Sequence, residues 1–117
     1  MDPEDRQKIE KIIADRKKAH GRLVQGGSGV YKAFLDMEKA AYAPGSLSTT
    51  QKELIAVGIA VDINCESCME WHIHQALLAG ATREQLLEAI DVGIEFGGGP
   101  ATVSARFALK VLEYYQA

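Results

Sequence analysis

The sequence lacks the features that direct a protein to nucleic acids or membranes. Its 117 residues carry 13 basic and 16 acidic side chains, a net charge of −3, so no basic excess favours nucleic acid or an anionic membrane surface as a partner. No apolar run approaches the roughly 20 residues that cross a bilayer. Residues 1–5 provide neither a basic n-region nor an apolar h-region, so we expect no signal peptide and a cytoplasmic location.

Strand patterns, internal repeats and linkers are missing as well. No segment shows the alternation of apolar and polar residues that is typical of a half-buried strand, whereas apolar residues recur at helical spacing. Apolar residues make up 47% of the chain and charged residues 25%, a balance that indicates a folded globular protein. We therefore expect residues 1–117 to form a single all-α domain, a helical bundle.

Cysteine is scarce, and both cysteines lie in one short motif, Cys65-Glu66-Ser67-Cys68. Residues three apart are neighbours on a helix, so Cys65 and Cys68 would share one face and could form a disulfide. His72 lies four residues beyond Cys68, roughly 6 Å further along the same face. The histidine would then reach Cys68 directly or through one water molecule.

A carboxylate on the preceding helix is placed to meet this histidine. Ser48-Thr49-Thr50-Gln51 predicts a capping box that opens a helix to about residue 61. Asn64 can cap the next helix, from about residue 65 to 79, with Gly80 after its end. The short link favours antiparallel neighbours, so Glu53 and His72 would both lie about 12–14 Å from the link. This level position is what a contact between Glu53 and His72 requires.

The other helices follow from apolar spacing and helix breakers. They are expected from residue 3 to about 19, from 30 to about 42, from the capping box at Thr82–Gln85 to about 96, and from Pro100 onward. The Glu53 helix has almost no polar face, so we expect it to be buried on all sides, within the bundle or at a subunit interface. His20 and His74 are expected at the surface.

The order in which the two thiols react stays open. A helix N-terminus favours the thiolate of Cys65, whereas His72 can take the proton of Cys68. The charge of Glu66 opposes either thiolate. We favour Cys68 as the attacking thiol and Cys65 as the resolving thiol.

The motif Glu53-x11-Cys65-x2-Cys68-x3-His72, followed by Gln75-Ala76-Leu77-Leu78-Ala79-Gly80, resembles the carboxymuconolactone decarboxylase superfamily. Within it, the chain is most similar to the AhpD-like alkylhydroperoxidase branch. The resemblance implies an all-α antioxidant enzyme without a bound cofactor, in which the second cysteine attacks and the histidine and glutamate relay a proton. Members usually assemble as homotrimers or homohexamers. One departure is Ser67, where many members have a histidine or tyrosine.

Several functions therefore remain open. The favoured one is a thiol-dependent oxidoreductase that reduces hydroperoxides or a partner's disulfide and needs an external thiol reductant, with Glu53, Cys65, Cys68 and His72 as its catalytic residues. A lactone-processing decarboxylase that uses His72 as acid and base is the alternative within the superfamily. A third possible function is a noncatalytic helical module whose cysteines bind zinc or sense redox state. The simplest interpretation is that the cysteines are buried and only fill space.

Overall fold

Apolar residues at helical spacing form six helices over residues 1–116, the part of the chain that this computed structural model describes. The helices are α1 (Pro3–Gln25), α2 (Gly29–Tyr42), α3 (Thr49–Asp62), α4 (Glu66–Leu78), α5 (Arg83–Gly97) and α6 (Gly99–Gln116). No strand occurs within the described residues. The expected all-α class is confirmed.

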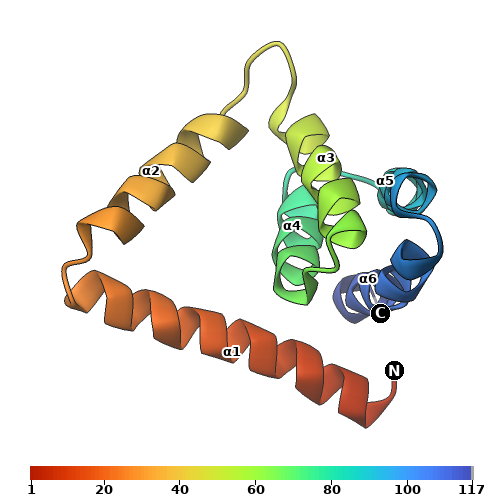
Figure 1. Cartoon of the computed structure of the whole chain (residues 1–117), viewed down its shortest axis with the longest axis horizontal. Coiled ribbons are helices and arrows are strands. Elements are labelled where there is room, and N and C mark those ends of the chain that lie inside the picture. The colour runs from red at the N-terminus through yellow and green to blue at the C-terminus, as the bar shows by residue number, and fades with distance from the viewer. Residues whose placement is uncertain (117) are drawn as a thin grey trace.

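Helices α3 to α6 pack together, and α3 contacts the other three (Figure 1). Their shared core is almost entirely aliphatic, and its fully buried large side chains include Val57, Val61, Met69, Ile73, Leu86 and Leu112. Two glycines let α3 and α5 approach closely, since a Cβ on Gly93 would lie 2.7 Å from the carbonyl oxygen of Gly58. Side chains there would push the two helices apart.

Both capping boxes form as expected. The Ser48 hydroxyl accepts the Gln51 amide while the Gln51 side chain accepts the Ser48 amide, and Thr82 and Gln85 repeat the arrangement at α5. Each box satisfies amides that have no partner within the helix. The starts of α3 and α5 are therefore fixed by local sequence.

The turn between α3 and α4 differs from expectation at Asn64. Asn64 has a left-handed backbone, with φ 53°, and ends α3: the Asn64 amide donates to Val61 and the Cys65 amide donates to Ala60. This is the Schellman pattern of a helix C-terminus, in which asparagine tolerates the left-handed position. Cys65 itself caps α4, so the prediction that Asn64 is the N-cap was wrong.

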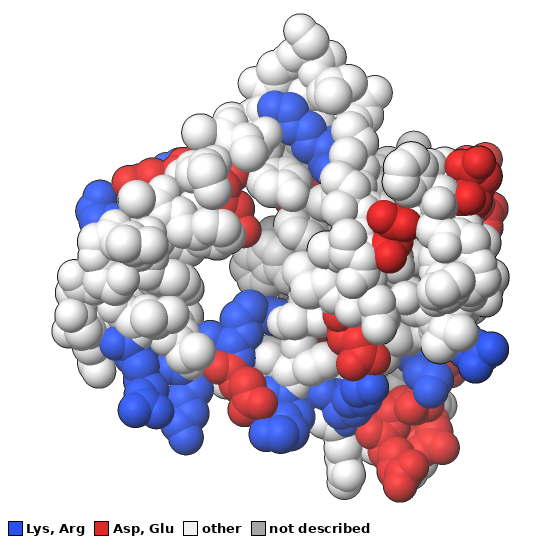
Figure 2. Space-filling view, viewed as in Figure 1, with Lys and Arg blue, Asp and Glu red and all other residues white. Residues whose placement is uncertain are grey.

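Helices α1 and α2 form an arm beside the bundle (Figure 1). We expected α1 to end near residue 19, where its apolar stripe stops, but it continues through Gly21 to Gln25 and ends at Gly26-Gly27, where Gly27 has φ 70°. Ile9 is fully buried against the bundle, whereas α2 contains no buried residue. The space-filling view shows an opening between the arm and the bundle (Figure 2).

A buried carboxylate fastens α1 to the bundle. Glu70 of α4 is fully buried, accepts a hydrogen bond from the Tyr115 hydroxyl and forms an ion pair with Arg16 of α1. The Arg16 guanidinium also lies over the Trp71 ring, 4.8 Å from its centre. Burial raises the pKa of the Tyr115 phenol, and its hydrogen bond to Glu70 adds to the shift. Tyr115 therefore remains a donor to the carboxylate.

Arg16→Leu is expected to lower the free energy of unfolding by about 3–5 kcal/mol, because it leaves the buried charge of Glu70 without its counter-ion. Lys32→Leu breaks an exposed ion pair with Asp36 and is the matched control, with an expected loss of at most about 1 kcal/mol. Denaturant titration of both variants measures the difference. Equal losses would show that the Arg16 pair does not anchor α1.

Helix α3 is buried on fewer sides than expected. Glu53, Ala56, Val57, Ala60 and Val61 are buried. Ile55 and Ile59 lie on the remaining face and are 52% and 54% exposed. The described residues leave about half of these two side chains exposed, so the apolar character of α3 is only partly explained by the bundle.

Candidate functional site

The two cysteines lie where the chain enters α4. A disulfide joins Cys65 to Cys68, with Cα atoms 5.1 Å apart, so the spacing of the motif does allow the bond. Cys65 is the N-cap residue, and its sulfur accepts a hydrogen bond from the Cys68 amide at 3.2 Å. An amide and the helix dipole both stabilise negative charge at this position. The cap geometry therefore favours a thiolate on Cys65 whenever the disulfide is open.

Glu53 and His72 meet across α3 and α4, as their level positions predict. His72 Nδ1 lies 2.8 Å from Glu53 Oε2, and the Glu53 side chain is only 6% exposed. Because a carboxylate accepts hydrogen bonds, it favours the tautomer that carries a proton on Nδ1, which leaves Nε2 as the basic nitrogen. The pair is thus arranged to hold a histidine ready to accept a proton.

The histidine and the cysteines share one helix face. Cys68 and His72 both lie in α4, four residues apart, and such residues are neighbours on the helix surface. Cys68 packs against the core while remaining partly exposed. A base one turn from a partly exposed thiol is the arrangement that activates a sulfur nucleophile.

Tyr42 also belongs to this site, although no sequence motif pointed to it. The Tyr42 ring stacks on the His72 ring, with centres 5.4 Å apart and planes 29° apart. Burial raises the pKa of the Tyr42 phenol, and the charges of Glu53 and Glu38 raise it further. Tyr42 comes from the end of α2, 30 positions before His72, and no spacing rule links residues so far apart.

The other two histidines lie outside the site. His20 is exposed, as expected, and its Nδ1 lies 2.6 Å from the Tyr31 hydroxyl. His74 was expected at the surface, but it is half-buried because its ring stacks on Tyr115 at 4.1 Å. Ser67, between the cysteines, is exposed.

In residues 1–116 no three side chains of histidine, cysteine, aspartate or glutamate are grouped so that they could hold a metal ion. Nor does any helix in this part of the chain combine the length and apolar character needed to cross a membrane.

Comparison with known proteins identifies the family. The sequence model of the Carboxymuconolactone decarboxylase family matches residues 28–111. The chain belongs to this family. The matched region contains Glu53, both cysteines and His72, and the cysteine pair agrees with the AhpD-like branch that the motif resembles.

Two relatives are similar to this chain over most of their length. An uncharacterised protein of Cupriavidus necator is 42% identical over 105 residues, which cover 90% of each chain. An uncharacterised protein of the cox locus in Paracoccus denitrificans is 40% identical over 95 residues, or 81% of this chain and 86% of the relative.

Solved structures of family members have the same fold. The apo form of a carboxymuconolactone decarboxylase family protein from Legionella pneumophila aligns over 93% of this chain and 95% of its own, with a TM-score of 0.82 and 30% identity. A family protein of Thermotoga maritima, described as having a possible involvement in the antioxidative response, aligns over 91% and 90% with a TM-score of 0.81 and 26% identity.

Proposed function

We propose that this protein is a thiol-dependent antioxidant oxidoreductase of the AhpD-like type, which reduces hydroperoxides or a partner's disulfide. The observation that carries the proposal is the Cys65–Cys68 pair at the start of α4, one turn from a histidine that a buried glutamate holds. Two cysteine thiols that are oxidised to a disulfide supply two electrons without a cofactor. The description of the Thermotoga relative supports an antioxidant role.

The proposed cycle begins with both cysteines reduced. His72 Nε2 takes the proton of Cys68, and the thiolate attacks one oxygen of the hydroperoxide. A sulfur–oxygen bond forms, the oxygen–oxygen bond breaks, and the leaving alkoxide takes up a proton as the alcohol. The Cys65 thiolate then attacks the sulfur of the Cys68 sulfenic acid, the disulfide forms, and the hydroxide that leaves takes up a proton as water.

An external thiol must return two electrons to reopen the disulfide. If the reductant attacks Cys68, Cys65 leaves as a thiolate at the helix N-cap, where its sulfur already accepts an amide hydrogen bond. A stabilised leaving thiolate speeds such exchange. The cap therefore suits Cys65 to the resolving role. A cytoplasmic location, which we also propose, would provide thiol reductants.

A second candidate function follows from the family's name. In a lactone-processing decarboxylase the same His72 would act as acid and base, with Glu53 fixing its tautomer, and the cysteines would take no part. The two functions therefore make opposite predictions about the thiols.

Thiol titration before and after one equivalent of hydroperoxide, with metal analysis of the same sample, separates the candidates. We expect two thiols in the reduced protein and none after peroxide, with no bound metal. Thiols that persist after peroxide would contradict hydroperoxide reduction, and thiols that also persist after a small disulfide would contradict the proposed function and favour the decarboxylase. Stoichiometric zinc on intact thiols would favour the noncatalytic module.

We also expect the protein to be a homo-oligomer, a trimer or a hexamer by resemblance to its family. The physical reason is the extent of exposed apolar surface, which includes Val30, Met37, Val92 and Phe96 at 61–84% exposure. Monomers seldom expose so much apolar surface. Light scattering at low micromolar concentration should give a multiple of 12.7 kDa. Folded protein at the mass of one chain would contradict the expectation.

A further inference from the structure

Helix α2 carries an apolar stripe that residues 1–116 leave largely exposed. The stripe consists of Val30, Phe34, Met37 and Ala41, which recur at the spacing of one helix face and are all exposed. Val30 is 84% and Phe34 47% exposed. The half-buried residues of α2 lie on a different face, at Tyr31, Leu35, Glu38 and Tyr42. A 14-residue helix with no buried residue is too short to be stable in water without a partner.

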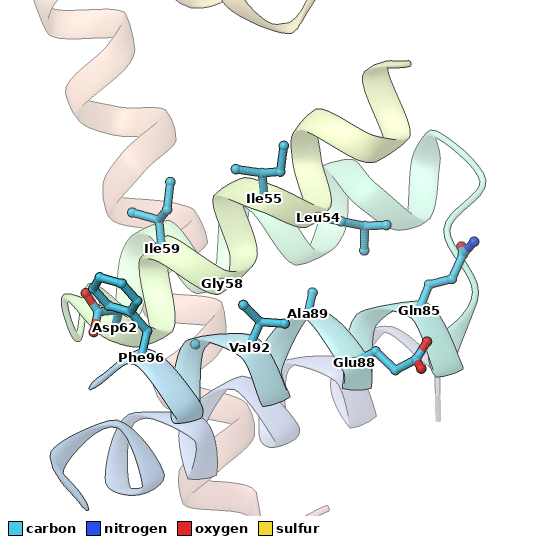
Figure 3. A pocket seen from close by; sticks show the side chains of 11 residues that line it. Leu54, Ile55, Gly58, Ile59, Asp62, Gln85, Glu88, Ala89, Val92 and Phe96 are labelled. Atoms are coloured by element: carbon cyan, nitrogen blue, oxygen red, sulfur yellow. The ribbon is translucent and has the colours of Figure 1, made fainter. Parts of the chain in front are cut away.

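An apolar groove lies between α3 and α5 of the bundle, and we call it the α3–α5 groove (Figure 3). Its volume is about 560 Å³, and its floor is formed by small residues, Gly58, Ala89 and Gly93. Ile59 on α3 and Val92 and Phe96 on α5 rise beside this floor. Val92 and Phe96 are 65% and 79% exposed, so residues 1–116 leave this side of the groove largely uncovered.

The stripe and the groove match in shape and length. A floor of small residues between larger ones accepts a single helix that presents large side chains, as in ridge-and-groove packing of helices. Two grooves facing each other would leave their floors uncovered, because both are concave. Helices α2 and α3 each have 14 residues, or about 21 Å, so the stripe can run the length of the groove.

Within one chain the two surfaces cannot meet. Helix α2 packs on α1 and α3 and contacts α4 through the stacking of Tyr42 on His72, and in Figure 1 it lies on the opposite side of α3 and α4 from α5. Every copy of the chain nevertheless carries both surfaces. A second copy is therefore the partner that supplies a matching helix for each groove and a matching groove for each helix.

We propose that the α2 stripe of one copy packs into the α3–α5 groove of a second copy. The contact buries Phe34 and Met37 of one chain against Gly58 and Val92 of the other. It also fixes the helix that carries Tyr42, whose ring stacks on His72. The inference does not depend on the proposed reaction, because it concerns only which surfaces meet.

Cross-linking tests the pairing directly. The background is full-length Cys65→Ser/Cys68→Ser, in which serine is a good replacement at the N-cap. In this background Phe34→Cys/Val92→Cys should give cross-linked chains of 25 kDa or more with a short thiol-reactive reagent, since two chains of 12.7 kDa are joined. Phe34→Cys alone and Val92→Cys alone should give none.

Four outcomes would overturn the proposal. Cross-linking of Phe34→Cys alone would place stripe against stripe, and cross-linking of Val92→Cys alone would place groove against groove. No cross-linking of the double variant would leave the groove to another occupant, such as an apolar ligand or a different protein. The control is Phe34→Cys/Leu109→Cys in the same background, since Leu109 is exposed on α6 outside both surfaces. Equal cross-linking of this control would also count against the pairing.

Val92→Asp gives an independent measurement on the otherwise unchanged chain. A charge in the groove should shift the mass in light scattering to a smaller species, whereas Leu109→Asp should leave it unchanged. An unchanged mass for folded Val92→Asp would contradict the proposal.

Discussion

Cys68→Ser is expected to abolish hydroperoxide turnover, because it removes the thiol that His72 can deprotonate from one turn away on α4. A serine hydroxyl at this position is too weakly acidic to attack a peroxide and cannot form the disulfide. Consumption of hydroperoxide in the presence of a dithiol measures the effect, with folding checked by thermal unfolding. Retained turnover would show that the chemistry does not depend on Cys68.

Cys65→Ser is the matched variant on the other side of the disulfide. Serine caps helices well, so α4 should start normally and only the resolving thiol should be lost. We expect one round of peroxide reduction, after which a sulfenic acid or a mixed disulfide remains on Cys68. Mass spectrometry after trapping with a sulfenic acid reagent identifies the residue. The same species on Cys65 in Cys68→Ser would reverse the order of attack.

Local sequence rules predicted the helix starts and the parts of the site whose residues lie close together in the chain. The capping boxes at Ser48 and Thr82 were confirmed because each uses only four consecutive residues. The contact between Glu53 and His72 could be predicted from two helices joined by a short turn, since equal distances from the turn bring residues level. Helix geometry alone determines such relations.

Features that depend on packing between distant segments could not be predicted in this way. Tyr42 reaches His72 because α2 leads the chain from the end of α1 back to the start of α3 (Figure 1). The spacing of apolar residues does not predict this path. His74 is half-buried because Tyr115, 41 residues later, supplies a ring for stacking. Asparagine is common both at the start of a helix and at a left-handed helix end. The Asn64 side chain accepts a hydrogen bond of 3.0 Å from the Ser104 hydroxyl of α6, which is a contact between distant segments.

His72→Gln is expected to slow peroxide reduction by about 10²–10⁴-fold, the usual range for loss of a general base. Glutamine keeps a polar side chain beside Glu53 but cannot accept a proton at neutral pH. His74→Gln, two positions further along α4, is the control and should leave the rate nearly unchanged, since His74 stacks on Tyr115 outside the site. Pre-steady-state formation of the disulfide isolates the step that His72 assists.

Glu53→Gln should slow the same step, because the neutral amide no longer stabilises the imidazolium that forms when His72 takes the proton of Cys68. If the two residues act as one relay, the double variant should be little slower than His72→Gln alone, since groups that act as a unit are not additive. A double variant whose rate is reduced by the product of the two single reductions would mean that Glu53 acts independently of His72. Denaturant titration then tests the remaining explanation, because Glu53 is buried against α4 and its replacement would change the stability of the α3–α4 pair instead of the proton transfer.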